Sequence, residues 1–494
     1  MPEHVDVIVV GAGLSGIGAA YHLQQQCPDR TFVLLEGRDD IGGTWDLFRY
    51  PGVRSDSDMH TLGYSFKPWK HDKAIADGPS IMAYLRETVA EHDIERHIRF
   101  GHHVERAEWS TPDARWTVTA TVTATGETVE LTCAFLFMCS GYYSYKGGYP
   151  AELPGIAEYQ GTVVHPQAWP DDLDYAGKDV LVIGSGATAM TLVPAMAVDA
   201  GHVTMLQRSP TYVVSRPDRD AIANALRKVL PESTAYRITR AKNIALGRYF
   251  YGQTRTKPAK VRQRLLDMVR KELGDEMVEA HFTPRYDPWD QRLCLIPNGD
   301  LYDAIRSGKA AVVTDVIETF TPTGVRLRSG AELEADIVVT ATGLQLVTLG
   351  EMDFLVDGVP VDFASTFTYR GIAYSDVPNL ASTFGYVNAS WTLRADLVCG
   401  WVCRVVNHLR ATGTDIVVPR LRESDHDMRP RPWIDGFSAG YIQRMVPLLP
   451  KQGDREPWMA HQDYKVEQRI LAKAPVADDV LQFERVGRPV SHVG

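Results

Sequence analysis

The sequence predicts an α/β protein with two Rossmann-like dinucleotide-binding domains and a helical insertion. Three features support this fold class: two glycine-rich loops, each between an apolar run and a helix-like run, and a strongly basic segment after the second loop. The chain has 494 residues, of which 44% are hydrophobic and 23% charged. That is enough for two or three globular domains.

The first loop, Gly11-Ala-Gly-Leu-Ser-Gly16, follows an apolar run and opens a helix-like run. Its three glycines permit, in turn, a tight turn, close approach to a pyrophosphate and close packing of helix on strand. The start of the helix favours phosphate charge. Glu36 ends the next strand-like run, where a carboxylate can accept hydrogen bonds from ribose hydroxyls. The loop therefore predicts a nucleotide with an unphosphorylated ribose.

The second loop, Gly184-Ser-Gly-Ala-Thr-Ala189, has alanine as its third small residue, which the motif permits. The next strand-like run ends in Gln207-Arg208 without an acid. A guanidinium at that place suits a ribose 2′-phosphate, which predicts NADPH. The alternative is that Arg208 is an ordinary surface arginine.

A basic segment follows the second loop. Residues 219–271 contain 14 Lys and Arg against 3 Asp and Glu, a net charge of +11, whereas the rest of the chain has 38 against 59, or −21. Runs 222–230 and 261–273 show helical apolar spacing around a basic middle. A solvated helical insertion is the favoured interpretation, and a basic amphipathic surface resting on anionic lipid is the alternative. Nucleic acid is not expected, because the whole chain is acidic and contains no recognised nucleic-acid module.

Cysteine usage and the N-terminus predict a cytoplasmic protein. None of the six cysteines forms a Cys-x-x-Cys pair, and the chain enters a strand-like run without a basic and apolar leader. No run approaches the roughly 20 apolar residues that cross a bilayer. We expect no membrane insertion, although peripheral contact through the basic segment stays open.

The return of strand-like runs after the basic segment predicts a discontinuous domain order. The predicted division is an FAD-binding domain at 1–150 and 343–494, an NADPH-binding domain at 151–216 and 289–342, and the helical insertion at 217–288.

Between the loops lies the run Tyr159-Gln-Gly161-Thr-Val-Val-His165-Pro-Gln-Ala-Trp169, followed by proline. It resembles the fingerprint of type I Baeyer-Villiger monooxygenases, which are class B flavoprotein monooxygenases, with Tyr159 in place of phenylalanine. Runs 42–58, 288–294 and 385–392 resemble the ethionamide-activating subgroup. The resemblance covers almost the whole chain.

This resemblance implies a monooxygenase that uses FAD, NADPH and O2. Through a C4a-(hydro)peroxyflavin it would convert small apolar ketones to esters or lactones and would oxygenate thioethers or thioamides. The alternatives are a sulfur- or nitrogen-oxidising monooxygenase without ketone activity and a non-oxygenating NADPH-binding flavoprotein. A disulfide reductase is disfavoured, because the cysteine spacings lack the usual redox motif.

The resemblance also implies catalytic roles for two residues. Arg292 would stabilise the negatively charged oxygen intermediates, and Asp56 would orient it. Without the resemblance, Arg292 would be taken as a salt-bridging arginine and Asp56 as a turn residue. His165 is interpreted as a hydrogen-bonding hinge in a domain linker, together with Gly161 and Trp169, and not as a proton-transfer group.

The remaining predicted site residues fall into two groups, and no metal site is expected. Those expected to bind FAD are Gly11, Gly13, Ser15, Gly16 and Glu36 and, as the resemblance implies, Thr44, Trp45, Asp46, Leu47, Asp56 and Val104. Those expected to bind NADPH are Ile183, Gly184, Ser185, Gly186, Ala187, Thr188, Ala189, Gln207 and Arg208 and, as the resemblance implies, Arg54, Ser55 and Asp56.

Overall fold

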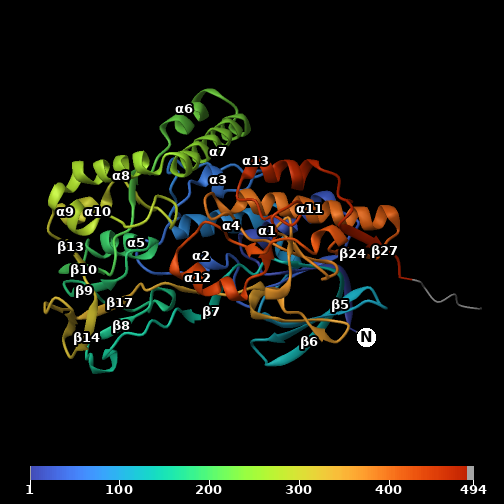
Figure 1. Cartoon of the computed structure of the whole chain (residues 1–494), viewed down its shortest axis with the longest axis horizontal. Helices are drawn as coiled ribbons and strands as arrows, with labels where there is room; N and C mark the ends of the chain where they lie inside the picture. The colour runs from blue at the N-terminus through green and yellow to red at the C-terminus, as the bar shows by residue number, and fades with distance from the viewer. Residues whose placement is uncertain (1, 487–494) are drawn as a thin grey trace, which may run out of the picture.

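The computed structural model describes residues 2–486 and confirms the predicted fold class (Figure 1). Two large sheets lie toward opposite ends of the molecule, and a group of helices covers the upper side in this view. The chain leaves the first sheet, builds the second, and returns to the first. This path explains why two segments far apart in the sequence share one sheet.

The first sheet has nine strands in the order β20-β19-β4-β5-β6-β1-β2-β3, with β23 also paired to β6. Its central strand β1 runs parallel to β2 and β6, so that Val7 lies opposite Phe32 and Phe135. The strands are β1 (Glu3–Val10), β2 (Phe32–Leu35), β3 (Ile98–Arg99), β4 (His102–Ser110), β5 (Arg115–Val122), β6 (Glu127–Met138), β19 (Asp353–Val356), β20 (Val359–Pro360) and β23 (Leu380–Ser382).

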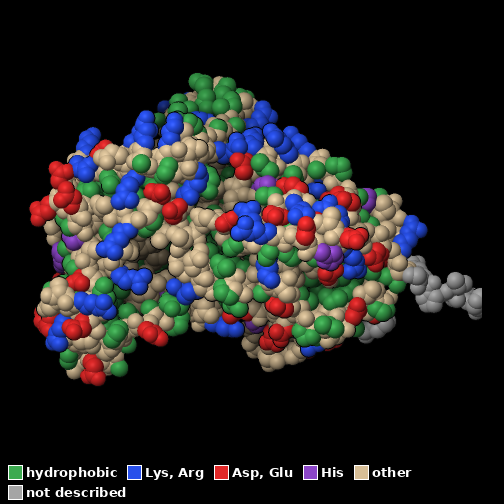
Figure 2. Space-filling view, viewed as in Figure 1, with side chains coloured by type: hydrophobic (Ala, Val, Ile, Leu, Met, Phe, Trp, Pro, Cys, Tyr) green, Lys and Arg blue, Asp and Glu red, His purple; other side chains and the backbone are tan. Residues whose placement is uncertain are grey.

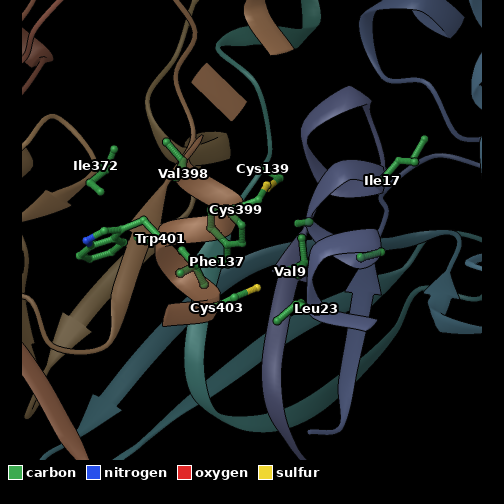
Figure 3. Close-up of a cluster of buried hydrophobic side chains, with 14 of the residues drawn as sticks. Val9, Ile17, Leu23, Phe137, Cys139, Ile372, Val398, Cys399, Trp401 and Cys403 are labelled. Atoms are coloured by element: carbon green, nitrogen blue, oxygen red, sulfur yellow. The ribbon is translucent and has the colours of Figure 1, made fainter. Parts of the chain in front are cut away.

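The core beside this sheet is formed by two helices from opposite ends of the chain. Helix α1 (Leu14–Gln26) packs on α11 (Trp391–Thr412). Figure 3 shows Cys399, Trp401 and Cys403 of α11 beside Phe137 of β6 and Leu23 of α1, and all five side chains are buried. Burial of this apolar surface fixes the C-terminal third against the first glycine-rich loop.

The second sheet has five parallel strands in the order β13-β10-β9-β17-β8. Helices α5 (Ala187–Met196) and α10 (Asp300–Arg306) contact one another beside it. The strands are β8 (Thr162–Val164), β9 (Asp179–Ile183), β10 (His202–Gln207), β13 (Ala310–Thr314) and β17 (Ile337–Thr340). Continuous apolar runs suit such strands, because parallel strands are covered on both faces.

The basic segment is helical throughout, including its middle. The structure has α6 (Ala221–Val229), α7 (Glu232–Thr256), α8 (Pro258–Leu273) and α9 (Asp275–His281). The sequence predicted a helical insertion at 217–288 but showed helical apolar spacing only over 222–230 and 261–273. The first half of the 25-residue helix α7 is well buried, and most of its second half is solvated. Basic residues interrupt its apolar positions, which hid their helical spacing in the sequence.

Two chain crossings connect the sheets. Strand β7 (Tyr143–Gly148) leads out of the first sheet, β18 (Leu344–Leu346) leads back, and the two pair antiparallel. The exact domain boundaries stay a prediction. Within the described residues all six cysteines are free and buried. Among residues 2–486, none of the helices combines the length and the apolar composition that a membrane span requires.

A buried ion pair holds the C-terminal segment in place. The Arg394 Nε donates to Glu467, with distances of 2.9 and 3.1 Å to its two oxygens, and both side chains have 0% exposure. Tyr386 donates to Glu467 at 2.6 Å, and the Arg394 NH1 donates to the Phe384 carbonyl oxygen. Burial raises the pKa of Glu467, which means that its ionised form depends on these partners.

Replacement of Arg394 by methionine is expected to reduce the free energy of unfolding by about 3–5 kcal/mol, because it leaves a buried carboxylate unpaired. Arg420→Met is the matched control, since its ion pair with Asp376 is exposed and contributes about 0–1 kcal/mol. Thermal unfolding of the three proteins at one scan rate provides the measurement. Equal losses of stability in Arg394→Met and Arg420→Met would show that the buried ion pair stabilises the fold no more than an exposed one.

Candidate active site

The two glycine-rich loops open into one cavity of about 1080 Å³. Its wall combines residues of the first sheet, the second sheet, the crossing strand β7 and the C-terminal segment. The predicted site residues on this wall are Gly11, Gly13, Ser15, Glu36, Thr44, Trp45, Arg54, Ser55, Asp56, Val104, Ile183, Gly184, Ser185, Gly186, Ala187, Thr188, Arg208 and Arg292.

The first loop has the geometry of a phosphate cradle. Gly11 has φ +101°, and a Cβ atom there would lie 2.7 Å from the Cys139 carbonyl oxygen. Helix α1 begins after Gly13 without a side-chain cap and without an acid in its first turn. The free N–H groups and the positive end of the helix dipole therefore face the cavity, which fits a pyrophosphate.

Glu36 is buried at the end of β2. Its two carboxylate oxygens accept hydrogen bonds from the backbone N–H groups of Ala12, at 2.7 Å, and Arg38, at 3.0 Å. Burial raises the pKa of Glu36, and these donors oppose that effect. Because a carboxylate oxygen can accept more than one hydrogen bond, acceptor capacity remains for ribose hydroxyls. These features fit the nucleotide end of FAD.

The second loop repeats this arrangement. Gly184 has φ +139°, and a Cβ atom there would lie 2.3 Å from the Ala341 carbonyl oxygen. Helix α5 begins after Gly186, again without a side-chain cap or an acid in its first turn. Arg208 is exposed at the end of β10, lines the cavity and makes no ion pair within residues 2–486. This wall fits a second dinucleotide whose ribose carries a phosphate.

Arg292 and Asp56 meet at the cavity wall. The Arg292 Nε donates to the Asp56 Oδ2 at 2.5 Å, although the residues lie 236 positions apart in the chain. The Asp56 carboxylate raises the pKa of Arg292 further above its ordinary value, so the guanidinium stays charged at any physiological pH. One third of the Arg292 side chain, 33%, remains exposed. Neither terminal nitrogen donates to another described residue, so both stay available to a ligand.

Arg54 links the segment that carries Asp56 to the second sheet. The Arg54 NH1 donates to the Asp300 Oδ2 at 2.5 Å, at the start of α10. Ser55 holds the following turn, because its Oγ donates to the Ser57 carbonyl oxygen at 2.8 Å. Arg54, Ser55 and Asp56 all line the shared cavity, and their contact with NADPH stays a prediction.

Aromatic side chains line one part of the cavity, and the sequence did not reveal them. Tyr142 stacks on Trp391 at 5.1 Å between ring centroids, and the Trp391 Nε1 donates to the Ser15 Oγ at 2.7 Å. Tyr441, on α12 (Gly440–Met445), also lines the cavity. Its segment is held near Arg292, because the Ser438 N–H donates to the Asp290 carbonyl oxygen at 2.6 Å.

Five of the predicted cofactor-binding residues do not line the cavity. Gly16 lies beneath the first loop, where a Cβ atom would collide with the Gly11 carbonyl oxygen at 1.8 Å. Asp46 is buried in an ion pair with Arg38, and Gln207 donates to His281 and Thr314 instead of facing the cavity. The other two, Leu47 and Ala189, are half-buried and buried respectively.

His165 joins the two domain crossings. Its Nε2 lies 3.3 Å from the Gly343 carbonyl oxygen, and its Nδ1 accepts from the Gln167 N–H at 3.2 Å. Burial lowers the pKa of His165, which favours a neutral ring that carries its proton on Nε2. A Cβ atom on Gly148 would lie 1.9 Å from this ring. His165 therefore has the contacts of a linker residue, and it does not line the cavity.

Gly161 and Trp169 also lie outside the cavity wall. Tyr159 folds over Gly161, where a Cβ atom would lie 2.3 Å from the tyrosine oxygen, and the hydroxyl donates to the Ala335 carbonyl oxygen at 2.8 Å. This hydrogen bond gives the tyrosine a partner that phenylalanine would lack. Trp169 packs beside the core of the second sheet.

Comparisons with known proteins agree with this geometry. Residues 4–410 match the model of the family "Flavin-binding monooxygenase-like". The chain is 50% identical over 493 residues to the FAD-containing monooxygenase EthA of Mycobacterium tuberculosis (strain ATCC 25618 / H37Rv), covering 99% of this chain and 100% of EthA. It is 46% identical to the probable FAD-binding monooxygenase AlmA of Acinetobacter baylyi (strain ATCC 33305 / BD413 / ADP1), covering 98% of this chain and 97% of AlmA.

The fold also resembles a solved structure of oxidized steroid monooxygenase bound to NADP. The TM-score is 0.79 at 22% identity, and the match covers 98% of this chain and 100% of that one. The relatives confirm the resemblance predicted from the linker fingerprint and the long sequence runs. The family model and the EthA sequence each match most of the chain. The chain therefore belongs to the flavin-binding monooxygenase-like family and is a flavoprotein monooxygenase.

Proposed function

We propose that this protein uses FAD, NADPH and O2 to insert one oxygen atom into apolar ketones, giving esters or lactones. We include thioethers and thioamides as substrates of the same site. The observation that carries the proposal is the Arg292–Asp56 pair, which faces the cavity shared by both glycine-rich loops. We place the enzyme in the cytoplasm, with any membrane contact made through the basic helical segment.

The cofactor assignment rests on the two loops. The first would hold FAD with its uncapped helix and Glu36, and the second would hold NADPH with Arg208. When bound, the flavin accepts a hydride from NADPH and supplies the activated oxygen. The steroid monooxygenase of the same fold was solved with NADP, which supports this pairing of sites.

Arg292 would stabilise negative charge on the reacting oxygen atoms. Asp56 holds only its Nε, so the planar fork of terminal nitrogens can donate to an oxyanion. An arginine suits this role better than lysine, because it keeps its proton and donates two parallel hydrogen bonds. The aromatic wall of Tyr142, Trp391 and Tyr441 supports the choice of an apolar substrate.

The proposal is tested by supplying the FAD-loaded enzyme with NADPH, O2 and either an apolar ketone or an aryl thioether. Ester or sulfoxide formed per NADPH oxidised is measured by chromatography, and hydrogen peroxide is measured in parallel. We expect oxygenated product from both substrates. Sulfoxide alone would indicate a heteroatom monooxygenase, and hydrogen peroxide alone would indicate a non-oxygenating flavoprotein.

Arg292→Ala is expected to lower the rate of product formation by about 100- to 1000-fold, since the loss of one oxyanion donor has that effect in other enzymes. NADPH oxidation should continue and yield hydrogen peroxide. Arg292→Lys should recover only part of the rate, because it keeps the charge but loses the fork. FAD content and melting temperature control for folding. If Arg292→Ala still formed one product molecule for each NADPH oxidised, the proposed role of Arg292 in stabilising the oxyanion would be contradicted.

Arg208→Ala is expected to raise KM for NADPH by roughly 10- to 100-fold, because a charge-assisted hydrogen bond is worth about 1.5–3 kcal/mol. KM for NADH should change little. Arg115→Ala is the matched control, since this exposed arginine lies on β5 of the other sheet. An equal change in both KM values would show that Arg208 does not contact the 2′-phosphate.

A further inference from the structure

The tip of the molecule is a helical hairpin with an unpartnered apolar face. Helices α6 and α7 pack on one another and project beyond the rest of the structure at the top of Figure 1. Figure 2 shows hydrophobic side chains gathered over this tip, with Lys and Arg side chains beside them. The surface of a soluble monomeric protein seldom exposes large apolar side chains in one contiguous patch.

The exposed apolar residues follow helical spacing. On α6 they are Ile222, Ala225 and Val229, of which Ile222 is 55% and Val229 77% exposed. Intervals of three and four residues place them on one face of the helix. The rest of the helix carries the polar residues Asn224 and Arg227, of which Arg227 pairs with Asp72. Helix α6 is therefore amphipathic, with its apolar face toward solvent.

Helix α7 repeats the pattern over a longer distance. Ile238, Ala241, Ala245 and Tyr249 are all exposed, at intervals of three, four and four residues. Tyr249 is 66% exposed. We call these four residues, together with the three of α6, the hairpin face.

Free cations flank the hairpin face. Lys228 on α6 and Arg237 on α7 are exposed, and neither makes an ion pair within residues 2–486. Other basic residues of the hairpin are already neutralised, as in the pairs Lys242–Asp220 and Arg248–Asp463. The hairpin thus offers both apolar side chains and unpaired positive charge.

We propose that the hairpin face docks on the surface of an anionic lipid bilayer. An amphipathic helix with apolar residues on one face and Lys or Arg at its border lies in the plane of such a surface. The apolar side chains enter the headgroup boundary, and Lys228 and Arg237 meet lipid phosphates. Docking goes beyond the proposed oxygenation, and it would bring the cavity close to apolar substrates dissolved in lipid.

A second copy of this chain fits the hairpin face less well. Two facing hairpins would bring the unpaired cations Lys228 and Arg237 of both copies close together, and like charges placed opposite one another disfavour association. A bilayer that contains phosphatidylglycerol supplies the opposite charge and an apolar interior at once. The charge pattern therefore selects lipid over self-association.

The test is cosedimentation of the full-length, FAD-loaded protein with vesicles of phosphatidylcholine alone or mixed with phosphatidylglycerol. We expect binding to the mixed vesicles, little binding to phosphatidylcholine, and loss of binding at high salt. Lys228→Glu/Arg237→Glu should weaken partitioning at least about 25-fold, since each basic residue contributes roughly fivefold. Ile222→Ser/Val229→Ser should weaken it roughly tenfold or more.

Val359→Ser is the matched control, because Val359 is 66% exposed on the edge strand β20 of the first sheet. It should bind vesicles like the parent protein. All variants should turn over a water-soluble ketone at the parent rate, which separates failure of docking from failure of the proposed oxygenation.

Three results would overturn the docking proposal: no binding to anionic vesicles, binding unchanged in both double variants, or self-association in solution that Ile222→Ser/Val229→Ser removes. Sedimentation velocity without vesicles detects the last of these.

Discussion

The ion pair between Arg292 and Asp56 is the interaction around which the site is arranged. A cation beside an apolar aromatic wall needs a fixed counter-charge, because an unpaired charge there would be strongly disfavoured. Asp56 comes from the segment before α3 (Met59–Leu62) of the first sheet's helical layer, and Arg292 comes from the loop before β12 (Cys294–Pro297). The pair therefore requires both halves of the molecule to be folded and in register.

The two glycine-rich loops impose a second constraint. Each ends at a helix whose first N–H groups lack a side-chain partner, and both helices point these donors into the same cavity. Two positive helix ends in one cavity favour the binding of two anionic nucleotides. Arg54 completes this arrangement, since its pair with Asp300 holds the segment between the loops against the second sheet.

Sequence reasoning located the parts of the site that depend on local chemistry. The loops from Gly11 and Gly184 could be predicted, because tight turns and close approaches demand glycine at fixed spacing. Arg292 and Asp56 came from resemblance alone, since nothing local distinguishes them from other surface residues. Tyr441 and Trp391 were missed, because their place on the cavity wall depends on how an irregular C-terminal segment packs over distant residues. Gln207 was expected beside NADPH, yet only the packed structure shows its side chain bonded to Thr314.

The paired crossings β7 and β18 have a consequence for motion. A single tether would leave one domain free to rotate about three axes relative to the other. Two crossings hydrogen-bonded to each other and joined by the His165 ring at Gly343 remove most of that freedom. Rotation about the line of the two strands would have to break the Arg54–Asp300 and Arg292–Asp56 pairs, which join the same two halves of the molecule. Gly148 permits the contact of the His165 ring with the two crossings, because a Cβ atom at position 148 would collide with that ring. Any larger residue there would push the ring away and loosen the link between β7 and β18.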